Sequence, residues 1–173
     1  NFKGFSPVSF KNKPNPVIVT EYASNGNLFN FLEKVRKSAN YSLWTNTKKL
    51  INIYGIASGM KYLHSQDVIH RQLQPSSIFL DDFLFPKISN FEAIKKLTEP
   101  SDSSEFEIFV EPSYVAPEIW QRKGYSKSSD VYAFSMIFYE IITNKKPQQM
   151  SKLRTKIMND VVNKGYRPDI DYS

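Results

Sequence analysis

The sequence predicts an α+β domain that is mainly helical, on three observations. Segments with the 3.6-residue apolar spacing of helices take up more of the chain than segments with strand character. The strand-like segments are short and bounded by turn residues, which favours small hairpins. One late segment, residues 130–143, is apolar on nearly every face, which is typical of a helix buried all round. With 173 residues the chain is long enough for one domain with a hydrophobic core.

The first predicted strand is "PVIVTEY", residues 16–22, because its β-branched and apolar residues are typical of a buried strand. "SNGN", residues 24–27, predicts a turn because Asn-Gly lies at its centre. "LFNFLEKVRK", residues 28–37, then has the apolar spacing of a helix.

The longest helix is predicted over residues 46–65, where apolar side chains recur at helical spacing and form one stripe. Asn46 or Thr47 is expected to cap its first turn. The stripe consists of Leu50, Ile53, Tyr54, Ile56, Ala57, Met60 and Leu63.

The second half begins with "SIFLDDFLFPKIS", residues 77–89, which predicts two short strands around the turn at Asp81 and Asp82. Residues 92–113 are polar and irregular and predict a long surface loop. After the buried helix, residues 151–165 predict a shorter amphipathic helix that Gly165 can end.

The composition excludes several classes of protein. The chain has no cysteine, so it has no disulfide and no thiolate metal site, which fits a reducing compartment. The net charge is +6, but no run of five or six like charges marks a tail that binds nucleic acid. No apolar stretch reaches transmembrane length, and the N-terminus lacks a signal-peptide pattern. We therefore expect a solvated basic surface, without nucleic acid or membrane as partner.

Five landmarks, in order, resemble those of the protein kinase family, on the serine/threonine or tyrosine-kinase-like side. Each is weak alone, but five in the family's order with suitable elements between them are specific. They are the hinge "TEYASNGNL" (20–28), the catalytic loop "HRQLQPSSIFL" (70–80), "ISNFE" (88–92) in place of D-F-G, "EPSYVAPE" (111–118) with an intact A-P-E, and the buried helix "SDVYAFSMIFYEIIT" (129–143).

The resemblance implies a partial kinase domain over residues 1–173. Residues 1–22 correspond to the end of the small lobe and the hinge, and residues 23–173 to the larger, mainly helical C-terminal lobe. The glycine-rich loop, the strand lysine and its partner glutamate are not in the sequence, and the family's final helices are incomplete. As a free half-domain, the chain is expected to be poorly stable, because the strand edge at residues 16–22 and apolar surface would be exposed.

The positions that perform phosphoryl transfer in the family have lost their charges. Gln72 stands where a carboxylate accepts the substrate proton, and an amide is not a base at neutral pH. Gln74 replaces a lysine, while Ser77 and Asn90 replace the two magnesium ligands. We therefore expect no intact catalytic residue and no metal site, which is the pattern of a pseudokinase.

Other residues match the structural framework of the family. The resemblance implies that His70, Phe91 and Asp130 are internal, with the Asp130 carboxylate accepting N–H groups from the His-Arg turn. It also implies that Glu118 is buried and that Arg71 can hold a phosphorylated loop. Simple core packing remains the plainer interpretation of this framework.

A nucleotide site is the next implication of the resemblance. Thr20 falls at the gatekeeper position, Glu21 and Ala23 at the hinge backbone, Asn27 at a ribose contact and Phe79 at the adenine floor. Half of this pocket would come from the small lobe, so ATP is expected to bind weakly or not at all, without magnesium.

The expected function is a cytoplasmic binding or regulatory module in signalling, with protein partners that contact loop 93–110 and the helix from Ser151. Phosphorylation of the loop would create a contact with Arg71; its candidate acceptors are Thr98, Ser101, Ser103 and Ser104. One alternative is an active, unconventional serine/threonine kinase that recruits Glu92, Asp81 or Asp82, although a hairpin turn is the better explanation of the two aspartates. A second alternative is a basic interaction domain that binds no nucleotide.

Overall fold

The computed structural model describes residues 2–8, 14–38, 41–97, 108, 110–147 and 153–170. Short 3₁₀ turns lie at Pro75–Ser77, Phe91–Ala93 and Pro112–Tyr114. The elements, in chain order, are β1 (Phe2–Ser6), β2 (Val17–Thr20), α1 (Leu28–Lys37), α2 (Asn46–Ser65), β3 (Val68–Ile69), β4 (Ile78–Leu80), β5 (Pro86–Ile88), β6 (Lys95–Lys96), α3 (Pro117–Trp120), α4 (Lys127–Thr143) and α5 (Arg154–Val162).

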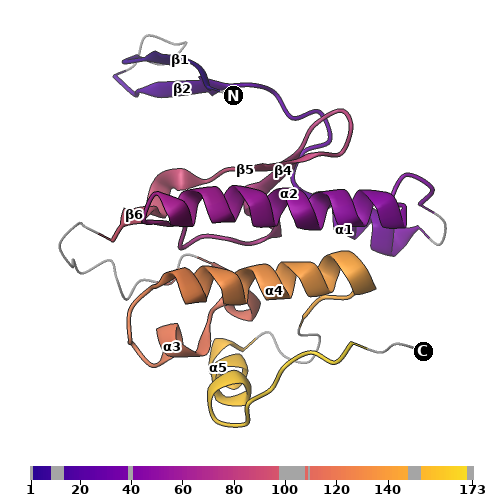
Figure 1. Cartoon of the computed structure of the whole chain (residues 1–173), viewed down its shortest axis with the longest axis vertical. Coiled ribbons are helices and arrows are strands. Elements are labelled where there is room, and N and C mark those ends of the chain that lie inside the picture. Colours follow the sequence, from indigo (N-terminus) through magenta and orange to yellow (C-terminus); the bar gives the residue numbers. More distant parts are fainter. Residues whose placement is uncertain are drawn as a thin grey trace.

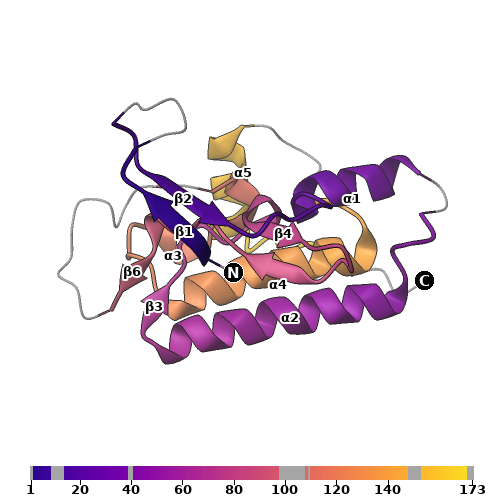
Figure 2. The same ribbon diagram turned by 90° about the horizontal axis from the view of Figure 1, so that it is seen from above.

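Helices form the main body, and three two-stranded antiparallel sheets are added to it. In Figure 1 the long helix α2 crosses the molecule, α4 runs below it, and α3 and α5 lie at the bottom. The β1–β2 hairpin stands above this body and is joined to it through the segment that leads to α1 (Figures 1 and 2). The predicted α+β, mainly helical architecture is confirmed.

The β1–β2 hairpin pairs Phe5 with Ile18 and Ser6 with Val17. The strand prediction is correct in place, but the expectation that this strand is buried is wrong: Ile18 is 69% exposed and Val19 is also exposed. The physical reason is that the sheet has two strands, and no described element packs across its faces.

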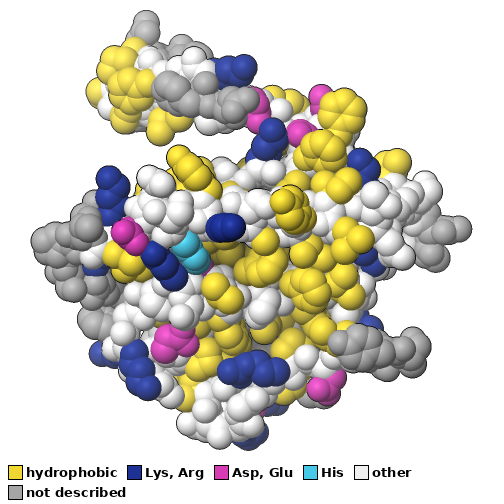
Figure 3. Space-filling view, in the orientation of Figure 1, with side chains coloured by type: hydrophobic (Ala, Val, Ile, Leu, Met, Phe, Trp, Pro, Cys, Tyr) yellow, Lys and Arg dark blue, Asp and Glu magenta, His cyan; other side chains and the backbone are white. Residues whose placement is uncertain are grey.

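Helix α1 has the predicted bounds, and its apolar face is buried. Helix α2 also has the predicted bounds, but Thr45 caps it, through a bond from the Lys48 N–H to its hydroxyl at 3.3 Å, in place of Asn46 or Thr47. The predicted stripe is partly wrong because Leu50 and Tyr54 are exposed; the buried side chains of α2 are Asn52, Ile56 and Met60. Figure 3 shows hydrophobic side chains gathered across the visible face of α2 and α4.

Two glycines allow the β4–β5 hairpin to lie directly on α2. A Cβ atom on Gly55 would meet Pro86 Cγ at 2.6 Å, and one on Gly59 would meet Ile88 Cδ1 at 2.6 Å. The same contact is fixed by Asn52, whose buried amide nitrogen donates to the Leu84 carbonyl at 2.9 Å. The predicted pair of strands and its turn are confirmed, because Asp81 Oδ1 accepts N–H groups within the turn.

Helix α4 lies at the centre of the core, as predicted, but it begins three residues earlier than expected, at Lys127, behind the cap Ser126. It is not buried all round, since Val131 and Ile142 are exposed. Its buried face includes Ile137 and Ile141, both fully buried among side chains of α1, α2 and β4.

The predicted long loop is not irregular throughout. Lys95 and Lys96 form β6, which pairs with β3. Residues 98–107 and 109 lie outside the described residues, and so do Ser151 and Lys152 at the expected start of the last helix. Helix α5 is described from Arg154 and ends at Val162, before the left-handed Gly165.

Candidate functional site: a cleft above a catalytic-loop scaffold

A cleft of about 620 Å³ lies between the β1–β2 hairpin and the helical body. Figure 3 shows the hollow between these two parts of the surface. Four of the five predicted nucleotide positions line it: Thr20, Glu21, Ala23 and Phe79. The remaining lining residues, which the sequence did not single out for this cleft, are Ile18, Tyr22, Lys87, Ile88, Ser89 and Phe91. Lys87 and Ile88 belong to the β4–β5 hairpin, which is predictable as a hairpin but not as one wall of a cleft.

Asn27 is the predicted nucleotide position that does not line the cleft. Its side-chain oxygen accepts the Asn30 N–H at 2.9 Å and so caps α1. Its backbone forms a bridge with Phe79, which places the start of α1 beside the floor of the cleft. The side chain is thus used for the helix in this structure, and a ribose contact would require it to leave that cap.

The hinge segment is fixed to the floor by hydrogen bonds. The Leu80 N–H donates to the Gly26 carbonyl at 2.8 Å, and the Asn25 N–H donates to the Leu80 carbonyl at 3.3 Å. The Asn25 amide also donates to the Asp81 carbonyl at 2.7 Å, and the Ser24 hydroxyl donates to Asp82. Because these bonds join the hinge segment to the β4–β5 hairpin, the part of the cleft where these two segments meet is already formed without a ligand.

One ion pair lies in the cleft wall. Lys87 Nζ is 3.0 Å from Glu21 Oε1 and 3.7 Å from Asp81 Oδ2. The hydrogen bond with Lys87 lowers the pKa of Glu21, and the same bond raises the pKa of Lys87. Both side chains are therefore charged at neutral pH.

Beneath the cleft, Asp130 holds the catalytic-loop turn from below. Its carboxylate is 2% exposed and accepts the His70 N–H at 2.9 Å and the Arg71 N–H at 3.1 Å. The His64 ring lies 2.9 Å away and gives the carboxylate a third partner. This arrangement confirms the contact that the resemblance implied. It also explains how Arg71 is held in a left-handed backbone conformation, with φ of 62°.

His70 is fully buried and joins the loop to the strand that precedes Asn90. Burial, which opposes the charged imidazolium, lowers the pKa of His70. A neutral ring fits its contacts: Nε2 donates to the Ser89 carbonyl at 2.9 Å, and Nδ1 accepts the Gln72 N–H at 3.2 Å. Phe91 meets the His70 ring edge-on, at 5.6 Å between centroids. The expectation that Phe91 is internal is wrong, because it is 46% exposed and faces the open cleft.

The four substituted catalytic positions fall into two pairs. Gln74 and Ser77 are used for structure: the Gln74 side-chain oxygen accepts the Glu111 N–H at 3.1 Å, while the buried Ser77 hydroxyl donates to the Gln74 carbonyl at 2.7 Å. Gln72 is partly exposed, and Asn90 is exposed with a left-handed backbone, φ 61°. All four side chains are uncharged.

Arg71 is buried and has several partners. Its Nε donates to the Ala93 carbonyl, and its guanidinium lies 5.6 Å from the centre of the Tyr125 ring. The candidate phosphate acceptors at positions 98, 101, 103 and 104 lie outside the described residues. Glu118, expected to be buried, is only partly buried, because it lies in the short helix α3 near the surface.

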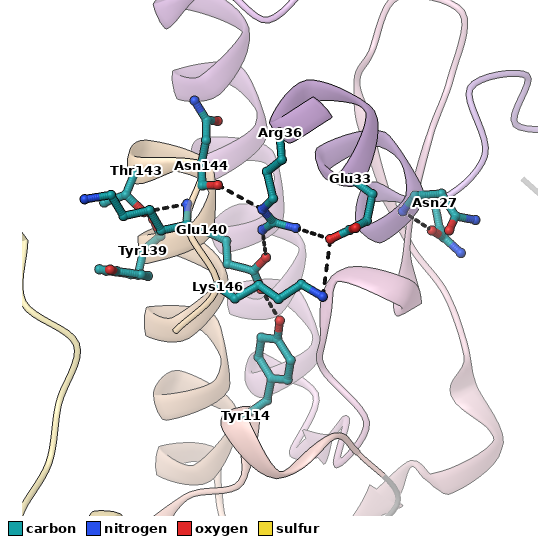
Figure 4. Close-up of polar contacts among 11 residues, drawn as sticks. Asn27, Glu33, Arg36, Tyr114, Tyr139, Glu140, Thr143, Asn144 and Lys146 are labelled. Carbon is teal, nitrogen blue, oxygen red and sulfur yellow. Dashed lines mark hydrogen bonds and ion pairs between the residues drawn. The ribbon is translucent and has the colours of Figure 1, made fainter. Parts of the chain in front are cut away.

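A buried ionic cluster that sequence reasoning missed joins α1, α4 and the turn before α3 (Figure 4). Glu140, only 1% exposed, accepts hydrogen bonds from Arg36 and from the Tyr114 hydroxyl. Arg36 also donates to the Asn144 carbonyl and to Glu33, both at 2.8 Å. The available signal was a glutamate inside an apolar helix, since such residues are rarely buried without a partner.

Burial has the largest effect on the pKa values of Glu140 and Tyr114 in this cluster. Burial raises the pKa of Glu140, although Tyr114 and Arg36 act in the opposite direction. Burial and the neighbouring carboxylate raise the pKa of Tyr114, so the phenol stays protonated and donates. The cluster thereby fastens the turn at residues 112–114 to the core.

The three carboxylates considered as replacements for the catalytic groups differ in their contacts. Asp81 is engaged by the hairpin turn and Asp82 by Ser24, whereas Glu92 is exposed next to Asn90. Among the described residues, no group of three or more histidines or carboxylates is arranged to hold a metal ion. None of the helices in the described part of the chain has both the length and the hydropathy needed to cross a membrane.

Residues 4–172 match the family model described as protein tyrosine and serine/threonine kinase. The chain belongs to the protein kinase family.

Three relatives illustrate the similarity. Two probable serine/threonine-protein kinases of Dictyostelium discoideum are 29% identical over 159 residues and 35% identical over 135 residues, covering 90% and 77% of this chain. An RGS domain-containing serine/threonine-protein kinase A of the same organism is 32% identical over 152 residues, 88% of this chain. The chain spans 12–13% of the length of these relatives.

Proposed function

We propose that this kinase-family chain is a pseudokinase: a catalytically impaired domain that acts in the cytoplasm as a binding or regulatory module for protein partners in signalling. In this proposal residues 1–22 are the end of the small lobe and the hinge, and residues 23–173 are the large lobe. Nucleotide binding in the cleft is weak and does not depend on magnesium.

The observation that carries the proposal is the contrast around one loop. Asp130 supports the His70-Arg71 turn as a catalytic loop requires, while the residues at the family's four phosphoryl-transfer positions carry no charge: Gln72, Gln74, Ser77 and Asn90. A positioned general base contributes roughly 10²–10⁴ in rate. At Asn90, which replaces the family's metal-binding aspartate, the attraction of a carboxylate for magnesium is also lost; even two unit charges 4 Å apart attract by on the order of 4 kcal/mol at a surface-like dielectric.

Two of these substitutions also have a structural use, which supports a maintained scaffold. Gln74 holds the Glu111 backbone, and Ser77 closes the turn that precedes β4. A side chain that is engaged in this way must break a hydrogen bond before it can contact a phosphate. These hydrogen bonds stabilise the fold of the loop, and they occupy side chains that phosphate transfer would need for contacts with the nucleotide.

An active, unconventional kinase is the competing function. Of its possible carboxylates, Glu92 is exposed and follows the cleft residue Phe91 in sequence, whereas Asp81 accepts two N–H groups of its own turn and Asp82 is bonded to Ser24. Glu92→Gln therefore tests this alternative directly.

Phosphate transfer from labelled ATP, with and without magnesium, is the deciding experiment. The purified protein, Glu92→Gln and Asn90→Ala would be compared with an active serine/threonine kinase as positive control. We expect no transfer above background by any of the three. Robust labelling by the wild type that is lost in Glu92→Gln or Asn90→Ala would overturn the proposal.

Partner capture tests the other half of the proposal. Proteins recovered from cells with the wild type would be compared with those recovered with Arg71→Ala and with an alanine variant of residues 98, 101, 103 and 104. A partner that is lost in both variants supports a phosphate-dependent module. No partner above background for the wild type would contradict the regulatory role.

A further inference from the structure

The hinge turn carries the sole Asn-Gly pair of the chain, Asn25 and Gly26. An asparagine before a glycine has its own chemistry, because the glycine backbone nitrogen can attack the side-chain amide carbon of the asparagine. Glycine has no Cβ atom that would obstruct this attack. A Cβ atom on Gly26 would meet nothing within 4 Å, so packing does not require a glycine here, whereas its positive φ of 67° favours one.

The reaction of this pair needs only water. Gly26 N forms a bond to Asn25 Cγ, the Cγ–Nδ2 bond breaks, and the amide nitrogen leaves as ammonia with the proton of the Gly26 N–H. Water then opens the five-membered succinimide at one of its two carbonyl carbons. Opening at Cγ gives aspartate, and opening at the backbone carbonyl gives isoaspartate, so a neutral amide becomes a carboxylate in either case.

In the structure, both reacting groups are held by hydrogen bonds. The Gly26 N–H donates to the Ala23 carbonyl at 3.1 Å, and the Asn25 side-chain amide donates to the Asp81 carbonyl at 2.7 Å. The Gly26 nitrogen can attack only after its N–H leaves Ala23, and the departing Asn25 nitrogen must leave Asp81. The backbone is also fixed, through the bond from Asn25 N–H to the Leu80 carbonyl and the bond from Leu80 N–H to the Gly26 carbonyl. The bonded hinge therefore opposes the reaction.

We propose that Asn25-Gly26 is a deamidation site whose rate is set by the hinge: the reaction is slow while the hinge is bonded to the β4–β5 hairpin and fast when these bonds open. The inference does not depend on nucleotide binding or on the phosphate-transfer positions. The product also acts on the hinge, because a carboxylate at position 25 has no N–H for the Asp81 carbonyl and places one acceptor beside another. Deamidation is thus a one-way change that favours the open hinge.

Peptide mass spectrometry of the purified protein, incubated at mildly alkaline pH, measures the formation of aspartate and isoaspartate at position 25. The chain unfolded in urea, at the same pH and temperature, gives the rate without the fold. We expect the folded wild type to react at least about tenfold more slowly, since two hydrogen bonds of the reacting groups must open and each changes the population about two- to tenfold. Asn27 and Asn30, which precede larger residues, are internal controls and should stay intact in both states.

Ser24→Ala loosens the hinge without changing a reacting atom, because it removes the hydrogen bond that Ser24 donates to Asp82. We expect it to accelerate deamidation of the folded protein about two- to fivefold, as for the loss of one hydrogen bond, and to leave the rate of the unfolded chain unchanged. Ser135→Ala is the matched control, since it removes a hydroxyl that donates to the Tyr132 carbonyl in α4, and it should react like the wild type.

Asn25→Asp reproduces the normal product and tests its effect on the hinge. Amide hydrogen exchange at Leu80, whose N–H donates to Gly26, should become about two- to tenfold faster than in the wild type. Exchange at Ile56, inside α2, should keep the wild-type rate and shows that the fold is intact.

Several results would overturn the inference. Equal rates in the folded and the unfolded wild type, or an unchanged rate in Ser24→Ala, would show that the hinge bonds do not control the reaction. Equal acceleration in Ser135→Ala and Ser24→Ala would trace the effect to global unfolding. If position 25 stays asparagine even in the unfolded chain, it is not a deamidation site, and if Leu80 exchanges at the wild-type rate in Asn25→Asp, the product does not open the hinge.

Discussion

Asp130 accepts N–H groups of the His70-Arg71 turn and Gln72 follows that turn in sequence, and the two side chains differ in charge and in surroundings. The carboxylate below is almost fully buried and is satisfied by two backbone N–H groups and by His64. The Gln72 side chain is partly exposed, and the Gln72 backbone N–H donates to His70 Nδ1. The comparison separates two kinds of polar residue, because the buried carboxylate specifies the loop conformation whereas the Gln72 side chain stays in partial contact with solvent.

The same contrast extends to the neighbouring elements. Below the loop, Glu140 has Arg36 and Tyr114 as partners inside the core. Near the loop, Phe91 lines the cleft and Asn90 is exposed. Buried charges without partners are costly, so partners below the loop are required for folding. Gln72 and Asn90 are free of that requirement, whereas the other two departures from the kinase pattern, Gln74 and Ser77, are used for structure.

The largest expected effect comes from removing a partner in the buried cluster. Arg36→Ala leaves Glu140 buried beside Tyr114 alone, and breaking a buried ion pair from one side costs about 3–5 kcal/mol. Urea unfolding should show a loss of this size. Lys37→Ala, at the exposed neighbouring position of α1, is the matched control and should change the free energy of unfolding by less than about 0.5 kcal/mol. Equal losses for the two variants would mean that the cluster does not carry this stability.

A somewhat smaller loss is expected for Asp130→Ala. Two buried N–H groups, of His70 and Arg71, lose their acceptor, and each unsatisfied buried group costs about 1–3 kcal/mol. We therefore expect a loss of about 2–4 kcal/mol in the free energy of unfolding, measured by urea titration. Asp130→Asn keeps one side-chain oxygen and should lose less. A loss for Asp130→Asn as large as that for Asp130→Ala would indicate that charge, not the number of acceptors, holds the turn.

Much of this scaffold could be predicted from sequence. The bounds of α1 and α2, the β4–β5 hairpin and the bond from Asp130 to the His-Arg turn follow from helical spacing, turn residues and the order of the kinase motifs. Exposure was harder to predict. Tyr54 belongs to the apolar stripe that predicts the buried face of α2, yet the residue is 76% exposed. Periodicity shows which residues share a face of a helix, but it does not show what covers that face. The partners of Glu140 come from segments about 26 and 104 residues away, a separation that no local pattern encodes.

A pH-dependent effect of smaller size should follow from Glu140. Burial raises its pKa in the folded protein above the ordinary value of 4.5, so the native state holds this proton to a higher pH than the unfolded chain. Its contribution to stability is therefore present below pH 4.5 and is lost as the pH rises through the folded pKa. Unfolding free energies measured from pH 4 to pH 8 should fall less steeply in Glu140→Gln than in the wild type. Parallel curves would mean that Glu140 ionises in the folded state as it does in the unfolded state.

The smallest expected effects concern the two neutral amides of the loop, Gln72 and Gln74. Gln74→Ala removes the acceptor of the Glu111 N–H, and a single hydrogen bond of this kind contributes about 0.5–1.5 kcal/mol. Gln72→Ala changes a partly exposed side chain whose backbone N–H still reaches His70, so we expect a change below about 0.5 kcal/mol. Thermal melting of the two variants side by side measures the difference. The two residues are a matched pair, because both are neutral amides two positions apart. A larger loss of stability for Gln72→Ala than for Gln74→Ala would show that the Gln72 side chain is packed more tightly than its exposure indicates. The contrast between Asp130 and Gln72 would then have to be withdrawn.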